Sequence, residues 1–290
     1  MNDARPFEFV PFGVRAPDGA LCCDGLVDGE TIHLSHWPRN KTAARWKADT
    51  SVEIALRYAE QGEAGGLVTN NHFDTDGVLA VFSLVNPDVA LAHRDVLVAA
   101  AEVGDFDEWS ADDRGVQLDF AVRAIAATAN GDAGAYARVL EELPDVLRRP
   151  EAHTRLWEKP WARLNELMRE ARDGAVTVSQ HGAIAVFAHR EGVDEMPGPV
   201  LSRLASAGCT RWLLAFDRGG GRWEYRYERA RWAWADTVTR PVVETPSRNA
   251  IAARLGSGWL MKGDLGMTGI LRSDGTLPLA PDDVAAILAA

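Results

Sequence analysis

The chain has little cysteine and no excess of basic charge. Each of these features excludes some classes of protein function. Only three cysteines occur in 290 residues, namely Cys22, Cys23 and Cys209. Adjacent cysteines seldom bridge each other, and no C-x-x-C pair is present to bind zinc. We therefore expect a reducing, cytoplasmic environment. The formal net charge of −11 argues against an extended nucleic-acid groove, because such a groove needs a basic face.

Long apolar runs and several common catalytic motifs are also missing. No segment approaches the roughly 20 apolar residues of a membrane-spanning helix, and the first residues lack the basic-then-apolar order of a signal peptide. We therefore expect no membrane partner. The nucleophile elbow of serine hydrolases, the phosphate-binding P-loop and a G-x-G-x-x-G after a strand are not found. The composition is otherwise ordinary for a globular protein, with 47% hydrophobic and 25% charged residues.

The most informative segment is an acidic turn within residues 65–77. A short apolar run ends in His72, Asp74 and Asp76, spaced two residues apart, and Gly77 follows. This order predicts a strand, a polar turn and a helix, and ligands of open α/β sheets gather just beyond such strand ends. One imidazole and two carboxylates would suit Mn²⁺, Mg²⁺ or Fe²⁺. The alternative is an ordinary Asp-Gly turn that carries a histidine.

The segments around this turn predict a parallel sheet. The expected elements are an irregular lead-in over 1–30, a strand over 31–37, a helix from a cap at 49–51 to about 61, a strand over 65–71 and a helix from Gly77. Alternation of strands and helices favours parallel strands. The loop at His36 and the turn at His72 should then lie on the same sheet edge and line one pocket.

The rest of the chain predicts a helical insert followed by a smaller β-rich part. Residues 86–172 are mostly helical in pattern. After residue 174 the period changes to that of strands, including a hairpin around the loop Gly219–Gly221. We therefore expect an α/β domain over 1–173, built on a parallel sheet with a helical insert, and a smaller α+β domain over 174–290 that grips the substrate.

The motif His72-Phe-Asp74-Thr-Asp76-Gly77 at the end of a strand resembles the first motif of the DHH phosphoesterase superfamily. The superfamily includes RecJ-type exonucleases, oligoribonucleases and manganese-dependent pyrophosphatases. Together with Leu34-Ser-His-Trp-Pro and Gly104-Asp-Phe, the motif resembles more closely a bacterial family without an assigned activity, over most of the chain. The resemblance implies a DHH-like fold for the N-terminal domain.

The resemblance also implies a set of metal ligands. His72, Asp74 and Asp76 match the first motif, whose carboxylates bind a pair of divalent metals. Asp105 is the best match for the lone Asp that bridges the metals, although the segment before it has the pattern of a helix rather than a strand. The chain departs from the superfamily because it contains no Asp-His-His tripeptide. His36 or His93 would have to supply the missing imidazole.

His36 and Asp105 are the candidate catalytic residues. Two metals hold an attacking hydroxide and a leaving oxygen in phosphoryl hydrolases. Asp105 would bridge or complete the ligand set, and His36 would act as a ligand or a general acid. Alternatively, His36 is a loop histidine packed on Trp37. For His93, at an expected helix start, a capping or exposed role is favoured over ligation.

Four polar residues are candidates for substrate binding. The amides of Asn70 and Asn71 could hold a substrate oxygen, or they could satisfy backbone groups of the turn. Arg222 and Arg226, beside the glycine loop, could bind a phosphate or carboxylate through paired hydrogen bonds. The alternative for the arginines is a solvent-facing row of Arg/Glu pairs across the hairpin.

These observations predict a metal-dependent hydrolase that acts on a small phosphorylated or otherwise anionic metabolite through metal-bound hydroxide. Mn²⁺ is the expected metal, with Mg²⁺ and Fe²⁺ as alternatives. Two other hypotheses stay open. One is a metal-dependent biosynthetic enzyme of another reaction class on the same scaffold. The other is a non-catalytic metabolite-binding protein.

Overall fold

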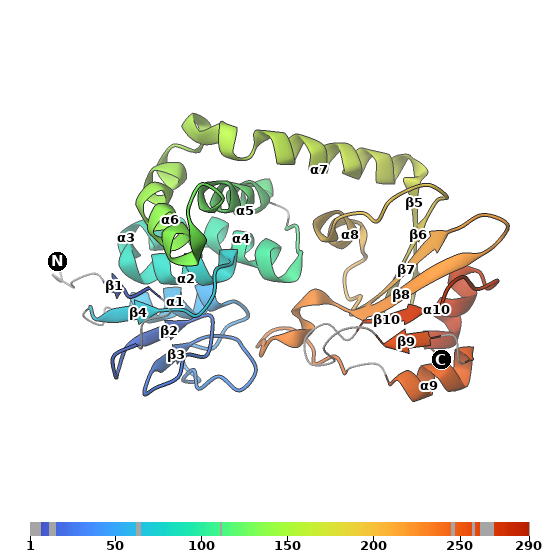
Figure 1. The fold of residues 1–290 in the computed structure, drawn as a ribbon, viewed down its shortest axis with the longest axis horizontal. Helices are drawn as coiled ribbons and strands as arrows, with labels where there is room; N and C mark the ends of the chain where they lie inside the picture. The colour runs from blue at the N-terminus through green and yellow to red at the C-terminus, as the bar shows by residue number, and fades with distance from the viewer. Residues whose placement is uncertain are drawn as a thin grey trace. The chain divides into compact units, whose positions relative to one another are not determined.

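A computed structural model of the protein describes residues 7–11, 16–61, 65–110, 112–244, 247–256, 259–261 and 270–289 (Figure 1). Residue contacts divide the chain into two compact units. Unit 1 comprises Met1–Ala162 with Ala235–Arg240, and unit 2 comprises Arg163–Trp234 with Pro241–Ala290. The first division falls inside helix α7 (Glu158–Glu170), before the boundary expected at residue 174.

Unit 1 is built on a four-stranded parallel sheet. Its strands, in spatial order, are β1 (Glu8–Phe9), β4 (Leu67–Thr69), β2 (Leu21–Cys23) and β3 (Ile32–Leu34). Each neighbouring pair is parallel, as the alternation of elements predicted. Because the carboxyl ends of parallel strands meet at one edge, the residues after β2, β3 and β4 lie close together.

The expectation of an irregular lead-in over residues 1–30 was wrong. Strand β2 lies there and is an inner strand of the sheet, between β4 and β3. Three apolar residues between Pro- and Gly-containing segments are too few to show the period of a strand. Cys22 and Cys23 are fully buried in this strand and form no disulfide.

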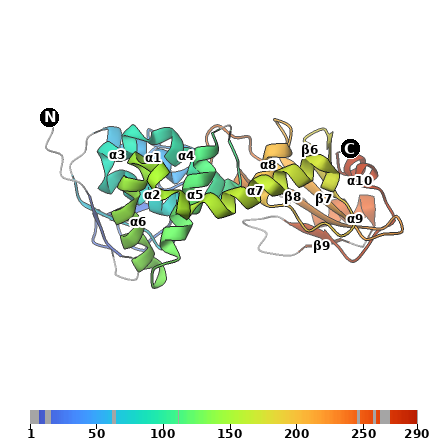
Figure 2. The same cartoon turned by 90° about the horizontal axis from the view of Figure 1, so that it is seen from above.

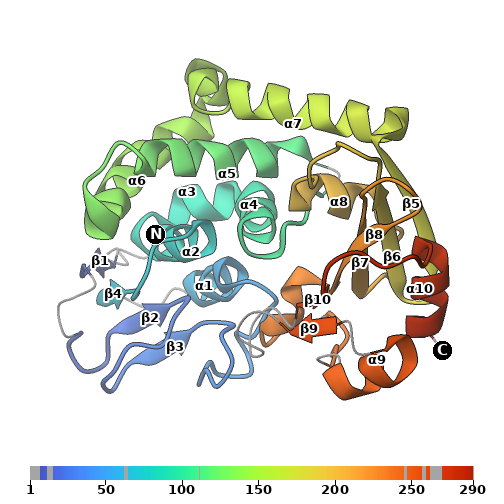
Figure 3. The ribbon, with the colours of Figure 1, turned by 45° about the vertical axis from the view of Figure 1, so that its right-hand side comes forward.

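The helices of unit 1 lie to one side of the sheet (Figures 1 and 3). They are α1 (Ser51–Glu60), α2 (Thr75–Val85), α3 (Pro87–Ala92), α4 (Arg94–Phe106), α5 (Asp113–Ala126) and α6 (Gly131–Arg148), followed by a 3-10 turn at Pro150–Leu156. Helix α2 contacts both the sheet and the helices α1, α4, α5 and α6. Its residues from Thr75 to Leu84 are all buried, which explains why the segment after Gly77 has no polar face.

Side-chain caps fix where the helices beside the strand ends begin. Thr50 accepts a hydrogen bond from the Glu53 amide at the start of α1, which confirms the predicted cap. Asp74 caps α2 by accepting from the Gly77 amide at 2.8 Å. Helix α2 therefore begins at Thr75, two residues earlier than the sequence predicted, and Asp76 lies in its first turn.

Unit 2 contains a six-stranded mixed sheet. The strands, in spatial order, are β5 (Val176–His181), β6 (Ile184–His189), β7 (Arg211–Asp217), β8 (Trp223–Arg229), β10 (Leu271–Ser273) and β9 (Trp259–Met261). Strands β6 and β7 pair in parallel, and the other pairs are antiparallel. The hairpin β7–β8 around the glycine loop is confirmed (Figure 2). The described part of the unit also contains most of α7 and the helices α8 (Gly198–Leu204), α9 (Arg248–Leu255) and α10 (Pro281–Ala289).

No helix in the described residues is both long and apolar enough to cross a membrane.

Gly77 should be intolerant of any side chain, because it lies where α2 meets the end of β4. A Cβ there would collide with Asn70 Nδ2 and lie 2.9 Å from Asp74 Oδ1. We expect Gly77→Ala to lower the free energy of unfolding by about 1–3 kcal/mol. Gly134→Ala in α6, where the nearest atom is 3.5 Å away, should instead raise it by about 0.5–1 kcal/mol. Urea denaturation of both variants checks this, and equal effects would contradict it.

A candidate metal centre at the strand ends of unit 1

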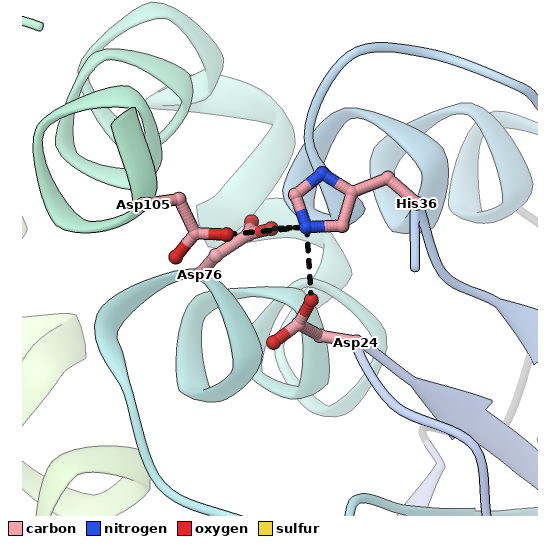
Figure 4. Close-up of side chains that lie close together, drawn as sticks. All are labelled: Asp24, His36, Asp76 and Asp105. Carbon is pink, nitrogen blue, oxygen red and sulfur yellow. Dashed lines mark ion pairs between the residues drawn. The ribbon is translucent and has the colours of Figure 1, made fainter. Parts of the chain in front are cut away.

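Four side chains converge at the carboxyl edge of the parallel sheet (Figure 4). Asp24 follows β2, His36 lies beyond β3, Asp76 is in the first turn of α2 and Asp105 is in the last turn of α4. The His36 Nε2 atom lies 3.3 Å from Asp24 Oδ1, 3.5 Å from Asp76 Oδ2 and 3.1 Å from Asp105 Oδ2. We call these residues group one. One ligand atom from each lies within 4.8 Å of the others.

A second set of ligand atoms adjoins the first. His72 Nε2 lies 2.7 Å from Asp74 Oδ2 and 3.3 Å from Asp24 Oδ2. Asp24, His72 and Asp74 form group two, again within 4.8 Å. Asp24 belongs to both groups and faces group one with Oδ1 and group two with Oδ2. A carboxylate shared in this way can bridge two cations held side by side.

The two imidazoles are oriented by their other ring nitrogens. His36 Nδ1 lies 2.7 Å from the backbone oxygen of Asp49, and His72 Nδ1 lies 2.8 Å from Asn71 Oδ1. Both contacts leave Nε2 facing the carboxylates. A metal-binding histidine usually has such a partner on its second nitrogen, because the partner fixes the ring and its tautomer.

The N-terminus of α1 holds the carboxylates of group one. The backbone N–H groups of Ser51 and Val52 donate to Asp76 Oδ2 and Oδ1, each at 2.8 Å. The hydroxyl of Ser51 donates to Asp24 Oδ1 at 2.9 Å. The free N–H groups and the dipole at a helix N-terminus favour negative charge, so α1 fixes Asp76 before any ligand arrives. The other Asp24 oxygen, Oδ2, is buried and faces His72 Nε2 at 3.3 Å.

Burial and crowding shift the protonation of the whole cluster. Burial raises the pKa of Asp76 well above its usual value, and the charges of Asp24 and Asp105 add to this. Burial also raises the pKa of Asp105 to about 7. Burial acts against charge on Asp24 and His36, but their neighbours outweigh it. His36 and His72 lower the pKa of Asp24, and Asp105 and Asp24 raise that of His36. His72 follows the same pattern: burial opposes its charge, yet its carboxylate neighbours raise its pKa to about 10.

These atoms fit a divalent cation of intermediate hardness. Carboxylate oxygens and imidazole nitrogens are the donors, and neither group contains a thiolate. The nearby Cys22 thiol donates to the Gly25 carbonyl, and burial raises its pKa to about 12. Oxygen ligands with some imidazole suit Mn²⁺ and Fe²⁺, whereas zinc sites are often built on cysteine.

The structure places all five metal ligands expected from the sequence in the two groups. The residue that belongs to both groups is a sixth one, Asp24, which was not expected. Asp24 was missed because residues 1–30 were interpreted as irregular. A signal was present, since an apolar run ends there in Asp24-Gly25, the same order that marked Asp76-Gly77. Asp105 belongs only to group one, on a helix, and so does not occupy the shared position that the resemblance implied.

The two asparagines after β4 support the site. Asn70 is fully buried; its Nδ2 donates to Tyr136 Oη at 2.8 Å, and its Oδ1 accepts from the Asn71 amide. Asn71 orients His72 as described above. A Cβ on Gly25 would lie 2.5 Å from Asn71 Oδ1 and 2.7 Å from Asn70 Oδ1. The close approach of these amides therefore requires glycine after Asp24.

Arg222 and Arg226 belong to unit 2 and to neither group. Arg226 makes two hydrogen bonds with Glu195, at 2.7 and 2.5 Å, and its Nε lies 3.3 Å from Glu228. Arg222 donates to the side chain and backbone of Thr276. Both guanidinium groups therefore have protein partners. Arg226 and Glu228 are buried and do not form a solvent-facing row, whereas the Glu195 side chain is 41% exposed. His93 lies between α3 and α4, outside both groups.

Comparison with known proteins identifies the family of the chain but no activity. A family profile described as "Family of unknown function (DUF6687)" matches residues 5–260, and the chain therefore belongs to this family. No curated protein matches the chain significantly.

Cation binding at this centre should release protons. The raised pKa of His36 keeps Nε2 protonated near neutral pH, and Asp105 is partly protonated there. A cation must displace these protons, so affinity should fall as the pH is lowered from about 8 to about 6, by up to roughly tenfold per pH unit for each proton displaced. Calorimetric titration with Mn²⁺ in two buffers of different ionisation enthalpy measures the number released. An affinity and enthalpy independent of pH and buffer would contradict the prediction.

Proposed function

We propose that this member of the DUF6687 family is a metal-dependent hydrolase of a small phosphorylated or otherwise anionic metabolite. The observation that carries the proposal is the pair of ligand groups joined by the Asp24 carboxylate. Two bound cations would supply an activated water and positive charge near a departing oxygen. A purely structural acidic cluster has no need for two imidazoles oriented toward a shared carboxylate.

The chain's own residues have distinct parts in this proposal. Asp76, Asp105 and His36 would hold the inner cation, and Asp74 and His72 would hold the outer one. His36 acts as a ligand rather than a general acid, because its Nδ1 already contacts the Asp49 carbonyl and its Nε2 faces the carboxylates. If Nε2 held a cation, the only proton of the ring would be on Nδ1, which faces the Asp49 carbonyl and not the site.

Differences in exposure suggest the side from which a substrate approaches. The side chains of Asp24, His36 and Asp76 are fully buried, and Asp105 is 5% exposed. In group two, the side chains of His72 and Asp74 are 29% and 37% exposed. A substrate oxygen would therefore reach the outer cation first. Trp37 packs against His72, with ring centroids 5.2 Å apart, and would border the entry.

The donor set favours Mn²⁺ as the cation. Mg²⁺ prefers oxygen ligands and keeps several of its waters, whereas each group here offers one imidazole nitrogen. Fe²⁺ is the main competitor on chemical grounds, since it accepts the same donors. Once loaded, the cations would reverse the negative field of the carboxylates and attract an anionic substrate. The acidic chain as a whole supports a small substrate rather than extended nucleic acid.

Unit 2 is the proposed source of substrate-binding side chains. It contains a cavity of about 410 Å³ whose lining includes Arg218, Arg226 and Arg272, a size within the range of small-molecule sites. Acidic residues also line it, including Glu195 and Glu224, so a ligand with both positive and negative groups would fit better than a simple anion.

The likeness to DHH phosphoesterases remains part of the proposal. The acidic motif His72-Phe-Asp74-Thr-Asp76 and a two-cation arrangement support it. In this chain the shared carboxylate, Asp24, precedes that motif in sequence, and His36 and His72 supply the imidazoles in place of an Asp-His-His tripeptide.

Activity should depend on Mn²⁺ and on the shared carboxylate. We expect the protein to hydrolyse at least one of bis-p-nitrophenyl phosphate, pyrophosphate or a dinucleotide, to lose this activity with EDTA and to regain it with Mn²⁺. Asp24→Asn should lower kcat/KM at least about a hundredfold, because changes even beyond the direct ligands cost 10- to 100-fold. The control is Glu141→Gln, whose side chain is 74% exposed.

The outcome also separates the rival hypotheses. Stoichiometric Mn²⁺ binding without hydrolysis of any phosphoester would favour a biosynthetic enzyme of another class. A protein that binds no divalent cation at all would be a metabolite-binding protein at most, and the hydrolase proposal would fail.

A further inference from the structure

The segment Ala235–Arg240 packs in unit 1, although the chain on both sides of it belongs to unit 2. We call this segment the strap. It follows the 3-10 turn Arg231–Trp234 and precedes Pro241. Nearly two hundred residues of sequence separate it from His36, yet its contacts concentrate around two ligands of group one.

The strap fixes the backbone of the loop that carries His36. The Asp236 amide donates to the His36 carbonyl oxygen at 2.7 Å. The Asp236 carboxylate accepts from Asn40 Nδ2 at 3.0 Å and pairs with Lys47. The strap therefore holds this loop at three points between residues 36 and 47.

The strap also holds the residue that orients the His36 ring. The Asp49 carboxylate accepts from the amides of Val238 and Thr239, at 2.6 and 2.9 Å, and from the Thr239 hydroxyl. Arg240 Nε lies 3.2 Å from the same carboxylate. Burial acts to raise the pKa of Asp49, but these four donors outweigh it and lower the pKa. Because the Asp49 carbonyl contacts His36 Nδ1, fixing Asp49 fixes the direction of Nε2.

Arg240 connects this loop to the helix end that carries Asp105. Its guanidinium pairs with Glu102, at 2.9 Å, and with Glu108, which lie on either side of Asp105 in sequence. It also lies over the Phe106 ring, 4.8 Å from the centroid. The Arg240 side chain is only 15% exposed, so its charge is poorly screened by solvent. Without it, three carboxylates would repel one another here.

We propose that the strap is a positioning element for group one, with Arg240 as its central residue. It holds His36 and Asp105, which come from different elements, at the separation that one cation requires. The inference rests on the proposed function, because it presumes that group one binds a cation. Among the described residues, no hydrogen bond or ion pair joins the strap to His72 or Asp74. The effect should therefore be confined to group one.

Mn²⁺ binding in two single-site backgrounds tests this inference. His72→Ala leaves group one as the intact set, and His36→Ala leaves group two. Free Mn²⁺ is counted by electron paramagnetic resonance during titration of each full-length, metal-free protein. Adding Arg240→Met should raise the Kd for Mn²⁺ about 10- to 100-fold in the His72→Ala background, the range for residues that orient metal ligands. In the His36→Ala background the Kd should stay the same.

Two further variants distinguish a local effect on group one from a general loss of structure. Arg94→Met removes another arginine of unit 1, which pairs with Glu60, and should leave both Kd values unchanged. Arg240→Lys keeps the charge but cannot reach three carboxylates at once, so it should give a smaller increase, again only for group one. It also provides the comparison if Arg240→Met does not fold.

The possible results separate the strap from the metal proposal itself. Equal weakening of both groups by the Arg240 variants, or no weakening of either, would overturn the inference while leaving the metal centre in place. Failure of the wild-type protein to bind Mn²⁺ would overturn the proposed function, and the inference with it.

Discussion

Mutual repulsion among buried carboxylates is the constraint on which the rest of unit 1 depends. Asp24, Asp76 and Asp105 lie around one imidazole, with almost no access to solvent. Burying several negative charges together is very costly unless they are neutralised. In the described structure, His36, the N-terminus of α1 and raised carboxyl pKa values share this task. A divalent cation would replace the protons and satisfy the carboxylates directly, which supports the proposal that this cluster is a binding site.

The scaffold around the cluster is arranged to tolerate that repulsion. The parallel sheet brings three strand ends to one edge, and α1 directs its free N–H groups at Asp76. Helix α2 is buried over most of its length, so Asp76 at its start cannot move away without disturbing the core. Asn71 and the Asp49 carbonyl fix the imidazoles. Asp76, His36 and His72 are thus held by groups outside the two ligand groups, an arrangement typical of preorganised metal centres.

The strap brings residues that are distant in the sequence into contact with the surroundings of group one. The strap contacts the His36 loop and the end of α4, so the surroundings of group one include residues 235–240. Group two is built from residues 24 and 72–74. The two groups should therefore differ in how strongly they depend on unit 2, to which the strap is covalently joined on both sides. Group two is the more exposed of the two, and group one is the more buried.

The sequence by itself predicted the parallel direction of the strands, the turn at His72 and the meeting of that turn with the loop at His36. It could do so because strand–helix alternation and the position of polar residues after apolar runs are local patterns. Only the tertiary structure decided that Asp24 is shared between two groups, that the end of a helix brings Asp105 to His36, and that residues 235–240 fasten both. Those choices depend on how a three-residue strand pairs and how distant segments pack, and no local period or spacing encodes either.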